Sequence, residues 1–80
     1  MELKDTIELM NSDDYRERFK AEYYQTKIRY DKLREMLIKC HDNVPELKSR
    51  TLEALDTQMY YMGKYLNCLE MRAEIEGIEL

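Results

Sequence analysis

Apolar residues recur every three or four positions along two long stretches of the chain, a spacing typical of helices that pack through one seam. The spacing predicts long helices over residues 13–40 and 51–76, preceded by a short amphipathic helix over residues 1–10. The first seam comprises Phe19, Tyr23, Thr26, Tyr30, Leu33, Leu37 and Cys40. The second seam comprises Leu52, Leu55, Met59, Met62, Leu66, Leu69 and Ala73.

Between the two long helices, residues 41–50 predict a turn, because Pro45 cannot continue a helix. Ser12 is expected to cap the first long helix, and Gly77 is expected to end the second. The two seams then face each other across one turn. The fold class predicted is all-α: an antiparallel two-helix hairpin with a short N-terminal helix, in a single domain over residues 1–80.

Folding the chain about Glu46 places Phe19, the largest seam residue, opposite Ala73, the smallest. The charges beside the seam agree with this register, because they form pairs of opposite sign and no like-charge pair. These pairs are Lys20 with Glu70, Arg34 with Asp56, and Glu22 with Arg72, and Arg29 meets the ring of Tyr65. The same register holds Cys40 and Cys68 too far apart for a disulfide, so both are predicted to be free thiols.

Many apolar residues lie off the seam and would stay exposed on a single hairpin. They are Tyr24, Ile28, Ile38, Tyr60, Met71, Ile75, Ile78 and Leu80. Two helices share one narrow core that cannot cover all of them, and a chain of 80 residues is marginally stable on its own. The sequence therefore predicts a homo-oligomeric helical bundle in which hairpins pack face to face.

The net charge of −4 argues against nonspecific DNA binding, since that binding requires a cationic surface. No apolar run approaches the roughly 20 residues of a membrane span. The first ten residues mix charged and apolar positions and do not resemble a signal peptide. We therefore expect a cytoplasmic protein that binds neither DNA nor a membrane.

The sequence offers little for catalysis. His41 is the only histidine, it lies in the predicted turn, and no nucleophile shows a recognisable base beside it. Residues 40–42 have side chains of metal-ligand type, but adjacent residues cannot easily wrap one ion and no second cluster exists. We expect no enzyme activity, no metal site and no cofactor.

A stripe beside the second seam carries the residues best suited to bind a ligand. It comprises Gln58, Tyr61, Tyr65, Cys68 and Arg72, and the first long helix brings Arg29 and Lys32 towards the same side. Tyrosine rings stack on nucleobases, and arginines hold phosphates through several donors. Tyrosines also pack at boundaries between subunits, which the spacing alone favours. Both interpretations stay open at this point.

Two stretches, TIELMNSDDYRERFKAEYYQTKIRYDKLREML and QMYYMGKYLNCLEMRAEIEGIEL, resemble a family of small helical proteins common in phages and prophages of Firmicutes. The spacing of Gln58, Met62, Tyr65, Leu69 and Arg72 also resembles the helical hairpin of phage anti-CBASS and anti-Thoeris sponge proteins. Those proteins form oligomers, up to hexamers, and sequester cyclic nucleotides or cyclic ADP-ribose-type signals without cleaving them. The present chain lacks the additional β domain of the anti-Thoeris branch.

The resemblance implies a phage anti-defence protein that sequesters nucleotide-derived immune second messengers in the cytoplasm of the infected bacterial host. For such a ligand, side-chain chemistry selects Arg29, Lys32, Lys64 and Arg72 as candidate phosphate contacts, Tyr61 and Tyr65 as candidate stacking or hydroxyl contacts, and Tyr24 with Lys27 as a second candidate group. The alternative function is a phage helical interaction module that binds a host or virion protein and no small ligand.

Overall fold

The computed structural model describes residues 1–42 and 49–80, and every regular element within these ranges is helical. The elements are the 3-10 helix η1 (Leu3–Thr6) and the α-helices α1 (Ile7–Met10), α2 (Tyr15–Asp42) and α3 (Ser49–Glu76). The all-α prediction is therefore confirmed for this part of the chain. Within the same ranges, no helix combines the length and the apolar character that a membrane span requires.

The long helices extend further into the connecting segment than the sequence predicts. α2 begins at Tyr15 and continues to Asp42, and α3 begins at Ser49. The outer residues of the predicted turn over 41–50 are thus helical. The middle of that turn, with Pro45, lies outside the described residues.

Asp14, rather than Ser12, caps the start of α2. Its Oδ1 atom accepts the backbone N–H of Arg16 at 2.9 Å. Its carbonyl accepts the N–H groups of Glu17 and Arg18, each at 3.1 Å. Ser12 supports this cap, because its Oγ accepts the Asp14 N–H at 3.0 Å and donates to Glu17 Oε1 at 3.1 Å. The carboxylate of Asp14 also complements the positive end of the helix dipole.

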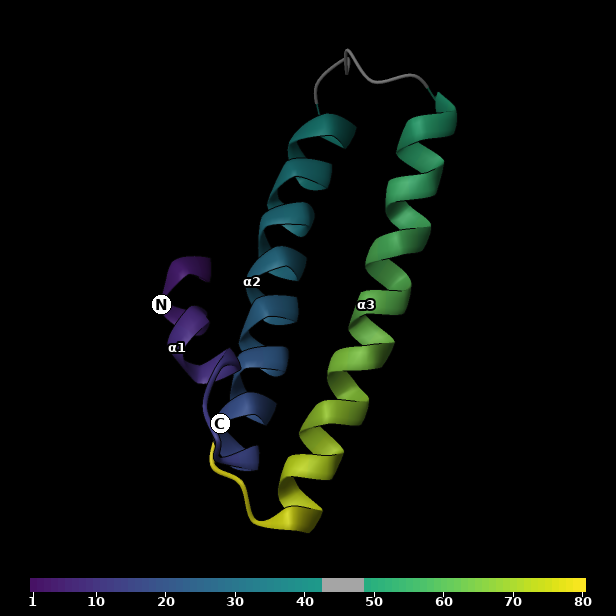
Figure 1. Ribbon diagram of the computed structural model, residues 1–80. Coiled ribbons are helices and arrows are strands. Elements are labelled where there is room, and N and C mark those ends of the chain that lie inside the picture. Colours follow the sequence, from purple (N-terminus) through teal and green to yellow (C-terminus); the bar gives the residue numbers. More distant parts are fainter. Residues whose placement is uncertain (43–48) are drawn as a thin grey trace.

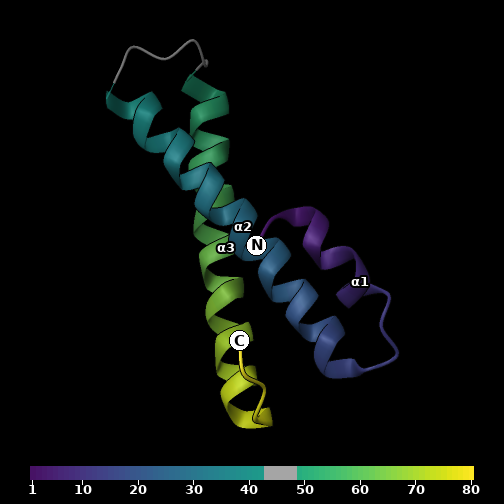
Figure 2. The same cartoon turned by 90° about the vertical axis from the view of Figure 1, so that its left-hand side faces the viewer.

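Helices α2 and α3 lie side by side, run in opposite directions and cross along their length (Figures 1 and 2). The N-terminal segment, η1 with α1, lies on the side of α2 that faces away from α3 (Figure 1). There the Gln25 amide donates to Thr6 Oγ1 at 3.0 Å and to Met10 Sδ at 3.4 Å. Thr6 is only 1% exposed, so this segment covers part of the outer side of α2.

The buried core lies where the start of α2 meets the end of α3, a region called here the closed end. Its members are Phe19, Tyr23, Leu66, Leu69, Ala73 and Ile78, each at most 7% exposed. Phe19 and Ala73 share this core, in agreement with the predicted register. Leu69 is fully enclosed, which makes the closed end the best-packed part of the molecule.

Ile78 belongs to this core, although the sequence places it among the surplus apolar residues. Gly77 adopts a φ of +69°, a left-handed conformation that glycine tolerates well. The chain then turns back, and the Ile78 N–H donates to the Ala73 carbonyl at 2.8 Å. Helical periodicity could not reveal this contact, because Ile78 lies beyond the end of α3.

The seam continues past the closed end but is less protected there. This part, called here the open half, comprises α2 from Tyr30 onward and α3 up to Gly63. Leu37 is buried within it, at 2% exposed. The other described seam residues of the open half are half-buried: Tyr30, Leu33, Cys40, Leu52, Leu55, Met59 and Met62. The open half therefore keeps apolar surface in contact with solvent.

Candidate functional site

A groove opens between α2 and α3 at the boundary of the open half. Its main hollow has a volume of about 490 Å³ and is lined by Tyr30, Asp56, Met59, Tyr60, Gly63, Lys64 and Asn67. A smaller hollow of about 110 Å³ shares Tyr30, Gly63 and Asn67 and adds Lys27, Leu66 and Glu70. Because the two hollows share three residues, we treat them as one groove. Its walls combine aromatic rings, lysines, carboxylates and an amide.

Gly63 determines how closely Tyr30 approaches α3. A Cβ atom at Gly63 would lie 3.3 Å from Tyr30 Cε1 and 3.5 Å from its hydroxyl oxygen, a tight contact. Glycine inside a helix costs about 1 kcal/mol relative to alanine, so the position is not optimal for helix stability. The missing side chain lets the Tyr30 ring lie against the backbone of α3 and form one wall of the groove.

Two lysines lie beside the rings of the groove. Lys64 Nζ is 5.4 Å from the centroid of the Tyr60 ring, and Lys27 Nζ is 5.9 Å from that of Tyr30. Both distances fall within the range of cation–π attraction. Lys27 also forms an ion pair with Asp31 at 3.2 Å. The ammonium groups are thus held near aromatic faces.

The carboxylates of Asp56 and Glu70 balance the lysine charges of the groove. Glu70 Oε2 accepts the hydroxyl proton of Tyr23 in a hydrogen bond of 2.8 Å. Burial of the Tyr23 ring and this bond to Glu70 raise the pKa of Tyr23 to about 12. The groove therefore offers both cationic donors and carboxylate acceptors to a ligand.

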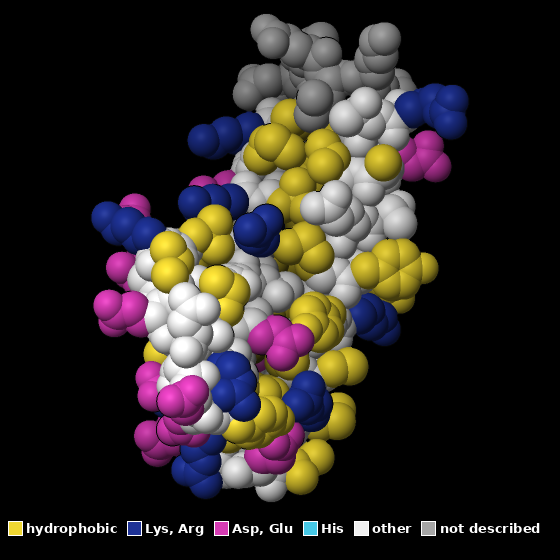
Figure 3. Space-filling view, in the orientation of Figure 1, with side chains coloured by type: hydrophobic (Ala, Val, Ile, Leu, Met, Phe, Trp, Pro, Cys, Tyr) yellow, Lys and Arg dark blue, Asp and Glu magenta, His cyan; other side chains and the backbone are white. Residues whose placement is uncertain are grey.

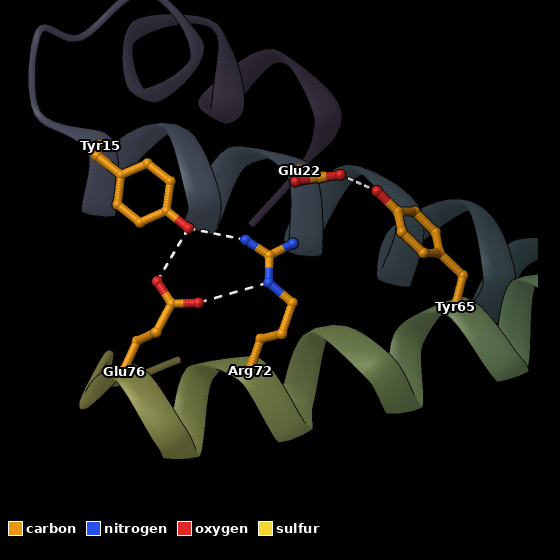
Figure 4. A network of polar contacts seen from close by, with 5 residues as sticks. All are labelled: Tyr15, Glu22, Tyr65, Arg72 and Glu76. Atoms are coloured by element: carbon orange, nitrogen blue, oxygen red, sulfur yellow. Dashed lines mark hydrogen bonds and ion pairs between the residues drawn. The ribbon is translucent and has the colours of Figure 1, made fainter.

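The opposite flank of the helix pair carries a different polar network (Figure 4). Arg72 donates to the Tyr15 hydroxyl at 2.7 Å and to Glu76 at 3.4 Å, and Tyr15 donates to Glu76 at 3.0 Å. Partial desolvation lowers the pKa of Arg72, but Tyr15 and Glu76 together raise it above its ordinary value. Glu22, which the sequence pairs with Arg72, instead accepts a hydrogen bond from Tyr65.

This network corrects two predicted contacts. The Glu22–Arg72 pair does not form; the guanidinium group of Arg72 instead donates to Tyr15 and Glu76. The guanidinium also lies 4.9 Å from the centroid of the Phe19 ring. The predicted contact of Arg29 with Tyr65 is replaced by the hydrogen bond from Tyr65 to Glu22.

The structure distributes the predicted ligand residues over several places. Lys27 and Lys64 line the groove. Tyr65 and Arg72 lie on the opposite flank, since positions 63 and 65 are about 200° apart around a helix. Tyr24 packs edge-on against Tyr23, with ring centroids 5.2 Å apart. The remaining candidates, Arg29, Lys32 and Tyr61, are exposed.

The polar and aromatic groove residues that the sequence analysis does not name as ligand contacts are Tyr30, Asp56, Tyr60, Asn67 and Glu70. Tyr30 was assigned to the seam, and Asn67 belongs to no apolar or charged pattern. The signal that could have located the groove is Gly63, a glycine inside a helix beside Lys64.

Among the described residues, no group of histidine, cysteine, aspartate or glutamate is arranged to hold a metal ion. Cys40 and Cys68 are free thiols, as predicted.

Comparison with known proteins gives a family assignment. A family model described as Sequestin matches residues 13–75, which include all of α2, α3 except its last residue, and all the residues that line the groove. The N-terminal segment lies outside the match. No curated protein and no solved structure is significantly similar to the chain.

Proposed function

The chain belongs to the Sequestin family, and on that premise we propose that it binds and sequesters a nucleotide-derived immune signal without cleaving it. The family name itself suggests sequestration. The signal would be a cyclic oligonucleotide or a cyclic ADP-ribose-type molecule made by an immune enzyme of an infected bacterium. The protein would be phage-encoded and would act in the cytoplasm of that host, as a homo-oligomer of up to six chains.

The observation that carries the proposal is the groove with its lysines beside tyrosine rings. Tyr30 and Tyr60 offer faces on which a nucleobase stacks, an interaction worth about 1–3 kcal/mol per base. Lys27 and Lys64 would donate to phosphate oxygens from their positions beside the rings. The carboxylates of Asp56 and Glu70 accept hydrogen bonds from ribose hydroxyls.

A ligand with few phosphates suits this balance of charge. The two acidic residues would repel a polyphosphate, whereas a cyclic nucleotide or a cyclic ADP-ribose isomer carries only two or three phosphate groups and several hydroxyls. Sequestration requires groups that contact the ligand, and the groove supplies aromatic rings, lysines and carboxylates for such contacts.

The remaining predicted residues stay candidates for ligand contact. Arg29, Lys32, Tyr61, Tyr65 and Arg72 would contribute if a ligand were bound at a contact between two chains, and Tyr24 packs against the core. One observation favours a second candidate function. Large apolar side chains are exposed on both long helices, among them Ile38 and Met71, and they suit an interaction module that binds a host or virion protein.

Isothermal titration calorimetry with a panel of cyclic di- and trinucleotides and cyclic ADP-ribose isomers tests the proposal. We expect at least one member to bind with a Kd of about 1 µM or tighter. The bound ligand should be recovered intact by mass spectrometry after prolonged incubation. Turnover of the ligand would identify an enzyme instead.

A matched pair of lysine substitutions locates the site. Lys64→Ala should weaken binding at least tenfold, whereas Lys4→Ala, with the same change of charge on the remote N-terminal segment, should leave it unchanged. Absence of binding across the panel tighter than about 1 mM would contradict the proposal. A stable protein partner in the same experiment series would then support the interaction module.

A further inference from the structure

The outer side of α3 repeats the spacing of the seam but faces solvent. Its residues step by four and three positions and are called here the outer stripe: Ala54, Gln58, Tyr61, Tyr65, Cys68, Arg72 and Ile75. Every member of the outer stripe is exposed, with Tyr61 at 65% and Ile75 at 77%. In the same helix, the seam residues Leu66 and Leu69 are at most 5% exposed. Helix α3 thus carries a second stripe, apolar except for Gln58 and Arg72, that is exposed to solvent although Tyr65 and Arg72 reach back to α2.

The molecule exposes more surface than a compact chain of its mass. Its accessible surface is 6225 Å², whereas a compact monomer of this size exposes about 5,200 Å². The radius of gyration is 15.1 Å, against about 11.6 Å for a compact domain of equal length. The excess of roughly 1,000 Å² is comparable to the 800 Å² or so that each partner buries in a stable interface.

The net charge of the chain and the spacing of the outer stripe both favour a second copy of the chain as the partner of this surface. The chain has a net charge of −4, so two copies repel each other through most of their surface. The outer stripe contains no acidic residue, and its single cation, Arg72, is already held by Glu76. A heptad-spaced stripe also matches itself, because a second copy presents side chains at the same intervals. Figure 3 shows apolar side chains gathered along α3 with acidic and basic groups beside them.

From these observations we infer that the outer stripe of α3 docks a second copy of the chain, stripe against stripe. The contact is isologous: each copy buries Tyr61, Tyr65 and Ile75 against the same residues of the other. The Tyr65–Glu22 bond and the Arg72 network form its polar rim. The inference concerns assembly and holds whichever ligand the groove binds.

The mass of the intact chain in solution, measured by light scattering after size exclusion, tests this interface. We expect at least twice the 9.8 kDa of one chain. Ile75→Glu and Tyr61→Glu should each lower the mass by at least half, and to that of a single chain if the stripe contact alone holds the chains together. Ile38→Glu replaces an exposed apolar residue of α2 in the same way, and it should leave the assembly unchanged. Circular dichroism verifies that each variant keeps its helices.

Three results would overturn the interface: a wild-type mass of one chain, an assembly that resists both stripe substitutions, or equal dissociation by Ile38→Glu. If the stripe variants lose their helices, alkylation of Cys68 in a Cys40→Ser chain decides the question. Cys68 lies within the stripe, so its thiol should react at least tenfold faster after dilution below the dissociation constant. A rate independent of protein concentration would exclude a contact through the stripe.

Discussion

The closed end and the open half use the same helices and the same seam spacing, yet they differ in how completely they pack. Leu69 at the closed end is fully buried, and Phe19, Ala73 and the returning Ile78 enclose it. Leu55 in the open half occupies an equivalent seam position but remains half-buried. The returning C-terminal residues supply a third layer at one end only. A regular seam therefore does not by itself produce a closed core.

The difference separates stability from binding. The closed end removes apolar surface from water, which stabilises the fold. The open half keeps space between the helices, and the groove lies at its boundary, where Gly63 admits the ring of Tyr30. Substitutions at the closed end should therefore affect unfolding, and those in the groove should affect ligand binding.

The largest effect is expected for Leu69→Ala, which should lower the free energy of unfolding by about 2–5 kcal/mol, because it creates a cavity in a filled core. Leu55→Ala removes the same atoms from a half-buried position and should cost clearly less. Urea unfolding followed by circular dichroism measures both values. Equal losses for the two leucines would show that the open half is as well packed as the closed end.

A second large effect concerns Tyr23 and high pH. The folded-state pKa is about 12, above the ordinary value near 10, so the folded chain holds this proton more tightly than the unfolded chain. The stabilisation is complete below pH 10 and is lost as the pH rises towards 12. The loss amounts to at most about 2–3 kcal/mol. Tyr23→Phe should remove this part of the pH dependence, as urea unfolding at a series of pH values would reveal. If the free energy of unfolding of the wild-type chain and of Tyr23→Phe changed identically with pH, a raised pKa of Tyr23 would be contradicted.

The seam could be predicted from sequence because burial repeats with the period of the helix. Thr26 illustrates how well the pattern tolerates an exception: it is half-buried, and its hydroxyl donates to the Glu22 carbonyl of the same helix at 3.0 Å. Ile78 escaped prediction, because a turn at Gly77 rather than a period places it in the core.

The candidate site was less predictable, because exposed side chains choose among partners of similar energy. Glu22 faces α3, which carries both Tyr65 and Arg72, and periodicity cannot predict which of these two side chains it bonds. The groove depends on the close approach of Tyr30 to Gly63, a detail of packing that no charge pattern reports. Sequence reasoning therefore recovered Lys27 and Lys64 but assigned Tyr30 to the core alone.

The two glycines offer a matched comparison of moderate size. Gly77→Ala forces a left-handed conformation on alanine and should destabilise the closed end by about 1–2 kcal/mol, while ligand binding stays unchanged. Gly63→Ala should change stability by less than about 1 kcal/mol, because the gain in helix propensity offsets the crowding of Tyr30. Its effect should appear in calorimetry, as ligand binding weakened at least tenfold. Loss of binding in Gly77→Ala alone would place the ligand at the closed end.

The smallest effect is expected for Arg72→Ala, and it separates the two flanks of the helix pair. Arg72 is exposed and contacts Tyr15 and Glu76 on the flank opposite the groove, so its removal should shift the urea midpoint less than Leu55→Ala does. If the groove holds the ligand within one chain, calorimetry should give a Kd within twofold of the wild-type value. If Arg72→Ala abolishes binding while the assembly keeps its mass, the ligand contacts the outer stripe. The ligand would then lie at the contact between two chains, on the flank away from the groove lysines.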